Sequence, residues 1–120
     1  MKYFFDSYAV VEIIKGNPSY AKYTQEEVVL AIFNLAEIYW SSLNRLGEEA
    51  AEDIYRQYKP SLIDINDDVL KNAMKFRRHH KHKNFSYADC IGYCLALQNN
   101  LKFLTGDKAF EGMDNVEFVK

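Results

Sequence analysis

The fold is indicated most directly by residues 3–14, Tyr3-Phe4-Phe5-Asp6-Ser7-Tyr8-Ala9-Val10-Val11-Glu12-Ile13-Ile14. Its aromatic residues favour a short strand, and that strand ends at Asp6. Ser7 is placed to cap a helix through Ile14, and Gly16-Asn17-Pro18 ends the helix. A strand followed at once by an apolar helix is the first half of a βα unit, so this stretch predicts an α/β fold.

The alternation of strands and helices continues along the whole chain. Further strands are predicted at 28–31, 62–65, 102–105 and 115–119. Helices are predicted at 33–46, at 48–58, from a cap at 66 or 67 to about 78, and from a cap at 86 to about 99, with a short helix possible in 19–27. We therefore expect one α/β domain over residues 1–120, with a mostly parallel sheet and helices on both faces.

Composition limits the class of protein. The 120 residues are 48% hydrophobic and 15% aromatic, which supports a real core and argues against disorder. The net charge of −2 is not the strongly basic balance typical of nucleic-acid binders. Cys90 and Cys94 stand one helical turn apart and are expected to be reduced, and neither a signal peptide nor a membrane-length apolar run is visible. These features favour a cytoplasmic protein without a membrane partner.

Four acidic residues stand in apolar surroundings. Glu37 is the only charged residue between Val28 and Trp40, and Asp89 is the only one between Tyr87 and Leu97. Asp6 ends the first strand, and Asp107 follows the strand at 102–105 across one glycine. Because ligands bind beyond the carboxyl ends of parallel strands, the four side chains are expected to converge at one edge of the sheet.

Converging carboxylates repel one another and raise each other's pKa, and a hard divalent cation relieves that conflict. Each acid taken alone has a structural alternative. Asp6 and Asp107 are compatible with helix-cap or turn residues, Glu37 with a buried ion pair, and Asp89 with a first-turn acid that interacts with the helix dipole. Asp64, inside a predicted strand, is interpreted as structural. The metal hypothesis therefore depends on the four acids together.

The ordered set of these segments resembles the PIN-domain nucleases, including the VapC-type ribonuclease toxins. The matching segments are Phe5-Asp6-Ser7, Leu35-Ala36-Glu37, Tyr87-Ala88-Asp89 and Leu104-Thr105-Gly106-Asp107 followed by Phe110. Their order and spacing agree along essentially the whole chain.

The resemblance implies that Asp6, Glu37, Asp89 and Asp107 bind Mg²⁺ or Mn²⁺ and form the catalytic site of an endoribonuclease. It also implies supporting roles for Thr105 and Ser7, and RNA products with a 5′-phosphate and a 3′-hydroxyl. A toxin of this kind is expected to act on RNA, to have an antitoxin partner and to form a homodimer.

A basic segment offers phosphate contacts. Residues 75–83 hold a third of the chain's Lys and Arg, together with all three histidines and no acid. Arg77, Arg78, Lys81 and Lys83 are the expected RNA-binding residues, provided that this segment returns to the active edge. The alternative is a solvated helix end, where cations favour the dipole. A histidine metal site is disfavoured because no carboxylate is interleaved.

Two alternatives to the ribonuclease remain. A PIN domain with weak or lost catalysis would be an RNA-binding or partner-binding module. An aspartyl-phosphate hydrolase or receiver-like domain built around Asp6 would need a second Asp close by, where Ser7 and Tyr8 stand. Tyr39, Trp40 and Leu43 widen the apolar face of their helix and are interpreted as core residues, or alternatively as a dimer contact or an antitoxin groove.

Overall fold

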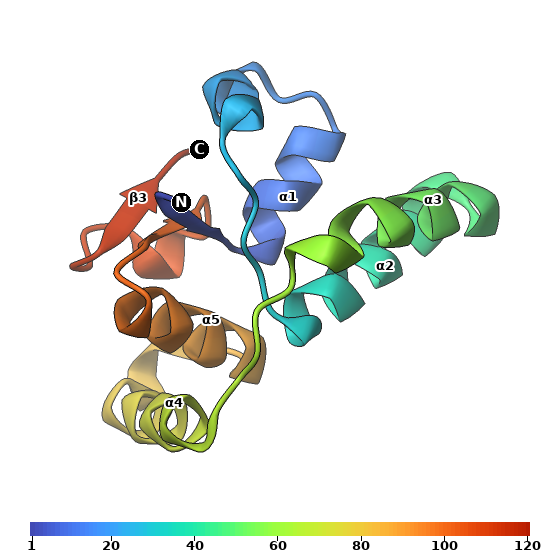
Figure 1. The fold of residues 1–120 in the computed structure, drawn as a ribbon. Coiled ribbons are helices and arrows are strands. Elements are labelled where there is room, and N and C mark those ends of the chain that lie inside the picture. Colours follow the sequence, from blue (N-terminus) through green and yellow to red (C-terminus); the bar gives the residue numbers. More distant parts are fainter.

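Three short parallel strands form the sheet at the centre of the computed structural model, which describes residues 1–120 (Figure 1). They are β1 (Tyr3–Phe5), β2 (Lys102–Thr105) and β3 (Val116–Phe118), in the spatial order β1-β2-β3. Phe4 pairs with Phe103 and Phe5 with Leu104. All strands run the same way, so their carboxyl ends lie at one edge of the sheet.

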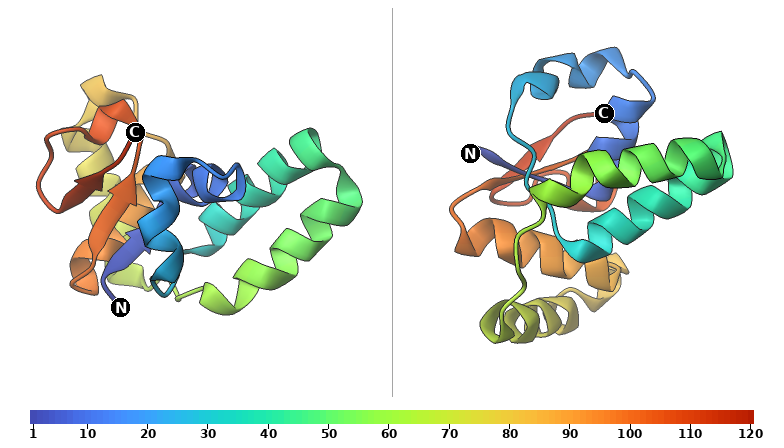
Figure 2. Two further views of the ribbon diagram at one scale, coloured as in Figure 1. Left: turned by 90° about the horizontal axis from the view of Figure 1, so that it is seen from above. Right: turned by 45° about the vertical axis from the view of Figure 1, so that its right-hand side comes forward.

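Helices cover both faces of this sheet, as the sequence predicts. The helical segments are α1 (Ser7–Ile14), η1 (Pro18–Gln25), α2 (Ile32–Leu46), α3 (Glu48–Tyr58), η2 (Lys59–Ser61), α4 (Asp67–His79), η3 (Lys81–Lys83), α5 (Tyr87–Gln98) and η4 (Lys108–Phe110). On one face, α5 approaches so closely that a Cβ on Gly92 would lie 2.9 Å from the Phe4 ring. Because side chains alternate along a strand, Phe5 and Leu104 point to the other face. Helix α1 packs against β1 and β2 (Figure 2).

Two helix pairs complete the architecture. The helices α2 and α3 form the expected hairpin, which extends away from the sheet, while α4 packs along α5 (Figure 1). Gly47 separates α2 from α3, with a φ of 91° that favours glycine. No helix combines the length and the apolar character needed to cross a membrane.

The strands predicted at 28–31 and 62–65 are wrong as regular strands. The two segments meet only in an isolated parallel bridge between Leu30 and Leu62. The first segment also accepts a hydrogen bond from the Phe5 N–H at the Val29 carbonyl (2.8 Å). Val29 and Leu30 are buried, as their composition predicts. Burial alone does not supply the row of paired backbone groups that defines a strand.

The cap predicted for α1 is also wrong by one residue. Asp6, not Ser7, is the N-cap: its Oδ1 accepts the Ser7 N–H at 2.8 Å, and Ser7 is the first helical residue. This leaves the Ser7 hydroxyl free to bond elsewhere. Asp6 is therefore the single residue between β1 and α1, and its role as the cap holds its carboxylate at the carboxyl edge of the sheet.

Candidate functional site

Asp6 lies at the bottom of a pocket at the carboxyl edge of the sheet, and it is 4% exposed. Its Oδ2 accepts a hydrogen bond from the Thr105 hydroxyl at 2.7 Å. Its Oδ1 accepts the Ser7 N–H, and its own N–H donates to the Leu104 carbonyl at 3.0 Å. The side chain and backbone of Asp6 are therefore fixed by the neighbouring strand and by the start of α1.

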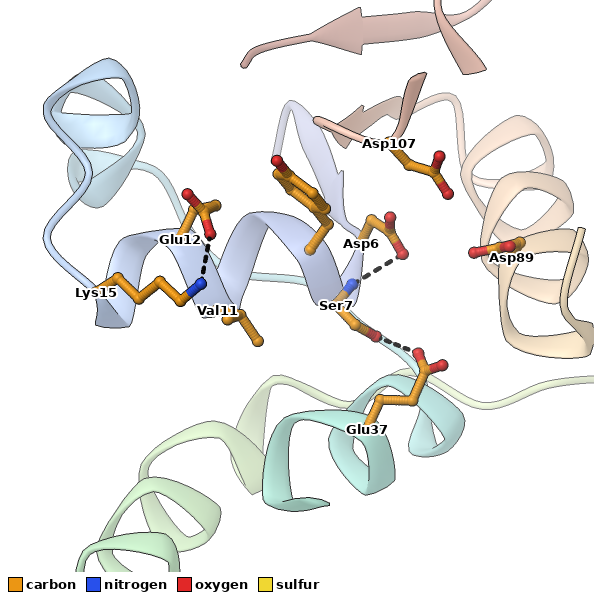
Figure 3. A pocket seen from close by; sticks show the side chains of 9 residues that line it. Asp6, Ser7, Val11, Glu12, Lys15, Glu37, Asp89 and Asp107 are labelled. Atoms are coloured by element: carbon orange, nitrogen blue, oxygen red, sulfur yellow. Dashed lines mark hydrogen bonds and ion pairs between the residues drawn. The ribbon is translucent and has the colours of Figure 1, made fainter. Parts of the chain in front are cut away.

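The other three acids line the same pocket, which has a volume of about 330 Å³. Glu37 comes from α2, Asp89 from α5, and Asp107 from the end of β2. The carboxylates of Asp6, Asp89 and Asp107 point toward one another, and Glu37 rises from α2 toward Ser7 (Figure 3). Asp64 is exposed and lies outside the pocket. The structure thus brings together the four acids that the sequence singled out; their role as metal ligands stays a prediction.

Asp89 and Asp107 are held by local backbone contacts. Asp89 and Ser86 form a reciprocal capping box at the start of α5: Asp89 Oδ2 accepts the Ser86 N–H at 2.9 Å, and the Ser86 hydroxyl accepts the Asp89 N–H at 3.0 Å. Asp107 caps η4 through its Oδ1, which accepts the Ala109 N–H at 3.0 Å. The Thr105 hydroxyl accepts the Asp107 N–H at 3.1 Å, so Thr105 contacts two of the acids.

Glu37 is held from α1. The Ser7 hydroxyl donates to Glu37 Oε1 at 2.5 Å, and it accepts a hydrogen bond from the Asn34 amide at 3.0 Å. Asn34 is 1% exposed. Ser7 therefore links α1 to two residues of α2.

The electrostatics of the pocket oppose full ionisation of its acids. Burial raises the pKa of Asp6 to about 7, with further contributions from the charges of Asp89 and Glu37, while the Thr105 hydrogen bond opposes the rise. Burial first, and then the charge of Asp107, raises the pKa of Asp89. Partial removal from water, followed by the charge of Asp89, raises the pKa of Glu37.

None of the four acids has a cationic partner. The two ion pairs of the molecule join Glu12 to Lys15 and Asp53 to Arg56. No three carboxylate, histidine or cysteine side chains lie close enough to form a ready-made metal-binding group. The donor set nevertheless fits Mg²⁺ or Mn²⁺ chemically, because these ions prefer carboxylate oxygens and would relieve the repulsion that raises the pKa values.

The basic segment lies beside the pocket without lining it. Lys83 donates to the Ala109 carbonyl at 3.0 Å, which ties η3 to η4 just after Asp107. Arg77 donates to the Phe85 carbonyl at 3.1 Å and lies 4.5 Å from the centre of the Tyr87 ring. Arg78 and Lys81 are exposed. RNA binding by Arg77, Arg78, Lys81 and Lys83 stays a prediction.

Sequence reasoning missed several residues of the pocket. Tyr8, Val11, Glu12 and Lys15 follow one face of α1, and Lys15 is the only cation in the pocket lining. Asn34, which does not line the pocket but donates to the Ser7 hydroxyl, was missed as well. It and Glu37 are the two non-aromatic polar side chains between Val28 and Trp40, and they stand three residues apart. That spacing places both on one helix face and is the signal that could have identified Asn34.

The apolar face of α2 divides between core and surface. Tyr39 and Leu43 are partly buried, whereas Trp40 is 69% exposed. Ile32 and Phe33 at the start of the helix are also exposed. The core interpretation is therefore wrong for Trp40. Ile32, Phe33 and Trp40 are three large exposed apolar side chains on the helix that carries Glu37, and together they are called the apolar surface on α2.

Comparison with protein families matches residues 3–116 to the PIN domain. Among solved structures, a toxin–antitoxin complex from Klebsiella pneumoniae is 16% identical, with a TM-score of 0.76 over 98% of this chain and 96% of the other. The Mycobacterium tuberculosis toxin VapC20, described as cleaving the sarcin–ricin loop, is 15% identical, with a TM-score of 0.76 over 97% and 99%. VapBC-1 from nontypeable Haemophilus influenzae is 16% identical, with a TM-score of 0.75 over 98% and 96%. No curated protein matches the chain.

Proposed function

Because the chain belongs to the PIN-domain family, we propose that it is a Mg²⁺- or Mn²⁺-dependent endoribonuclease and the toxin of a toxin–antitoxin pair. One observation carries the proposal. Four carboxylates from four separate elements line one pocket, and none of them is paired with a cation. Unpaired carboxylates with apolar neighbours destabilise the protein when no cation is bound, and a purely structural role does not explain that cost.

Asp6, Glu37, Asp89 and Asp107 are the proposed metal-binding and catalytic residues. A bound divalent cation would lower the pKa of water and neutralise charge on the scissile phosphate and the leaving oxygen. The protein's own contribution is to hold the carboxylates in place: Thr105 and the Ser7 N–H hold Asp6, the Ser7 hydroxyl holds Glu37, and Ser86 holds Asp89. No nucleophilic side chain is required for hydrolysis of this kind.

Substrate contacts are proposed within the pocket and on the basic segment beside it. Lys15 lines the pocket. Its side chain is half-exposed and forms an ion pair with Glu12. Arg78 and Lys81 are exposed on the neighbouring α4–η3 segment. Phosphates attract lysine and arginine, so Lys15 in the pocket, and Arg78 and Lys81 on the basic segment, are the proposed phosphate contacts.

An antitoxin is the proposed partner of the apolar surface on α2. Solved relatives include toxin–antitoxin complexes from Klebsiella pneumoniae and Haemophilus influenzae. Ile32, Phe33 and Trp40 are large, exposed and on the helix that carries Glu37, so a helix packed there would also restrict access to the pocket. A homodimer is proposed as well, and the mass of the purified protein in solution by light scattering would test it.

The deciding experiment measures RNA cleavage with Mg²⁺, with Mn²⁺ and with chelator. We expect cleavage only with metal, and products that carry a 5′-phosphate and a 3′-hydroxyl. Asp6→Asn and Asp89→Asn should each lower the rate at least a hundredfold, because each removes a ligand charge from the pocket. Asp64→Asn is the matched control, since Asp64 is an exposed acid outside the pocket, and it should cleave normally.

RNA binding without cleavage under either metal would instead support the non-catalytic binding module. Cleavage that persists in chelator, or that is unaffected in both Asp6→Asn and Asp89→Asn, would contradict the proposed site.

A further inference from the structure

A buried amide lies one hydrogen bond behind the pocket. Asn34 is 1% exposed on α2, three residues before Glu37. Its Oδ1 accepts the Ala31 N–H at 3.0 Å, and its Nδ2 donates to the Ser7 hydroxyl at 3.0 Å. Both ends of the amide are therefore occupied, one by the start of its own helix and the other by α1.

The orientation of this amide follows from its partners. The Ala31 N–H is only a donor, so the atom of Asn34 that faces it must be the carbonyl oxygen. The amide nitrogen must then face Ser7. Because the Ser7 oxygen receives this hydrogen bond, its own proton is available to Glu37 Oε1, which lies 2.5 Å away and accepts it.

The hydrogen bonds therefore run in one direction, from Asn34 through Ser7 to Glu37. Glu37 has a long side chain on an exposed stretch of α2, and Ser7 is its one hydrogen-bond partner. An unrestrained glutamate samples several rotamers, and ordering it costs conformational entropy. Residues that orient a metal ligand from behind commonly contribute ten- to a hundredfold to metal affinity.

We propose that Asn34 is a positioning residue, which acts through the Ser7 hydroxyl to orient the Glu37 carboxylate for a divalent cation. The inference rests on the proposed function and adds to it a residue that is not one of the four acids. Asn34 does not touch the pocket itself, so its effect on metal must pass through Ser7.

A double-variant cycle on Mn²⁺ affinity tests this path. The wild-type protein, Asn34→Leu, Ser7→Ala and the double variant are titrated with Mn²⁺ without RNA, by calorimetry or by electron paramagnetic resonance. We expect each single variant to weaken binding about tenfold. The double variant should also lose about tenfold rather than a hundredfold, because Asn34 has no path to Glu37 once Ser7 is gone.

Asn34 also supports the start of α2, so its loss will lower stability independently of metal. Asn34→Asp separates the two roles, because its carboxylate still accepts the Ala31 N–H but has no hydrogen to donate to Ser7. The charge that it adds is measured in the Ser7→Ala background and subtracted in the cycle. Asn44→Leu, the same change at an exposed position of the same helix, is the control and should bind Mn²⁺ normally.

The inference is overturned if the losses of Asn34→Leu and Ser7→Ala multiply to about a hundredfold. It is also overturned if Asn34→Leu or Asn34→Asp melts at a lower temperature without metal and yet binds Mn²⁺ as the wild type does. Failure of the wild-type protein to bind Mn²⁺ at all is a different result, which would contradict the proposed function together with this inference.

Discussion

At the scale of single residues, the pocket stores unfavourable free energy. Asp6 is almost fully buried, and burial together with Asp89 and Glu37 raises its pKa to about 7. Its two hydrogen bonds, from Thr105 and Ser7, favour the ionised form but do not offset the burial. A carboxylate kept in such a place at neutral pH weakens the metal-free protein and favours the bound state of any cation that enters.

The pH dependence of stability follows from this shift. The folded protein holds the Asp6 proton up to about pH 7, whereas the unfolded chain releases it near pH 3.8. Between these values the folded state binds more protons, so the free energy of unfolding falls as pH rises. The loss attributable to Asp6 is on the order of 4 kcal/mol, complete above about pH 7.

Asp6→Asn should abolish this part of the pH dependence. We expect the variant to be more stable than the wild type at pH 8 in chelator, and similar to it at pH 4, as measured by urea denaturation. Asp64→Asn, at an exposed site, should follow the wild-type curve. Parallel curves of stability against pH for Asp6→Asn and the wild type would show that the pKa of Asp6 is not raised in the folded state.

At the scale of elements, three of the four acids are placed by the end of a strand or by the start of a helix, whereas Glu37 lies in the second turn of α2. Asp6 follows β1 and Asp107 follows β2. Because the two strands are adjacent and parallel, the two aspartates start from neighbouring positions at the same edge of the sheet. Asp89 is in the first turn of α5, where the capping box fixes its side chain. Gly106 connects β2 to Asp107 in a space that excludes any side chain, since a Cβ there would lie 2.4 Å from the Val119 carbonyl oxygen.

Gly106→Ala should therefore displace the β2–Asp107 connection. The added methyl group also meets the Tyr8 ring at 2.3 Å and the Tyr20 hydroxyl at 2.8 Å, so backbone and side chains must both move. We expect a stability loss of about 1–3 kcal/mol, as for other overpacked sites, together with weaker Mn²⁺ binding. Thermal unfolding and Mn²⁺ titration measure the two effects.

Gly47→Ala is the control for Gly106→Ala. Its φ of 91° strains an alanine, but nothing lies within 4 Å of the new Cβ, and Gly47 is at the far end of α2. It should lose stability without losing Mn²⁺ affinity. Normal metal binding by Gly106→Ala would mean that the position of Asp107 tolerates this change.

At the scale of the whole molecule, a basic segment lies close to the acidic pocket. The chain carries a net charge of −2, yet α4 and η3 present a basic segment whose end is tied to η4, just after Asp107, by the Lys83–Ala109 hydrogen bond. If RNA is the substrate as proposed, its phosphates would be repelled by the unpaired acids and attracted by this segment. Binding of RNA should therefore depend on metal as well as on the exposed cations.

The double variant Arg78→Gln/Lys81→Gln should reduce the salt dependence of RNA binding. In an Asp89→Asn background that limits cleavage, each lost phosphate contact should lower the slope of log K against log salt by about 0.7 for single-stranded RNA. Fluorescence anisotropy at several salt concentrations gives the slope. Lys2→Gln/Lys59→Gln changes the charge equally at exposed positions outside α4 and η3, and a slope lowered as much by this control would exclude a specific role for the basic segment.

Local patterns predicted most of the helices because their signals are local. Asn66 and Ser86 cap α4 and α5 as expected, and Gly47 separates the two helices of the hairpin. The segments at 28–31 and 62–65 were predicted as strands because their apolar composition signals burial. Whether an extended buried segment becomes a strand depends on a partner of sufficient length, and each of these finds only the single bridge of Leu30 with Leu62.

The sequence alone determined the α/β class and the four acids of the pocket, because Asp6 and Asp107 follow strands and because a charge inside an apolar run, as at Glu37 and Asp89, is unfavourable wherever the chain folds. It did not identify Asn34, Tyr8 or Lys15, whose side chains are ordinary for a helix. Only the tertiary structure decided that Asn34 meets Ser7 and that Lys15 shares the pocket with Asp89. The physical reason is that hydrogen bonds act over about 3 Å, and residues 27 or more positions apart reach that distance only when the helices that carry them pack together.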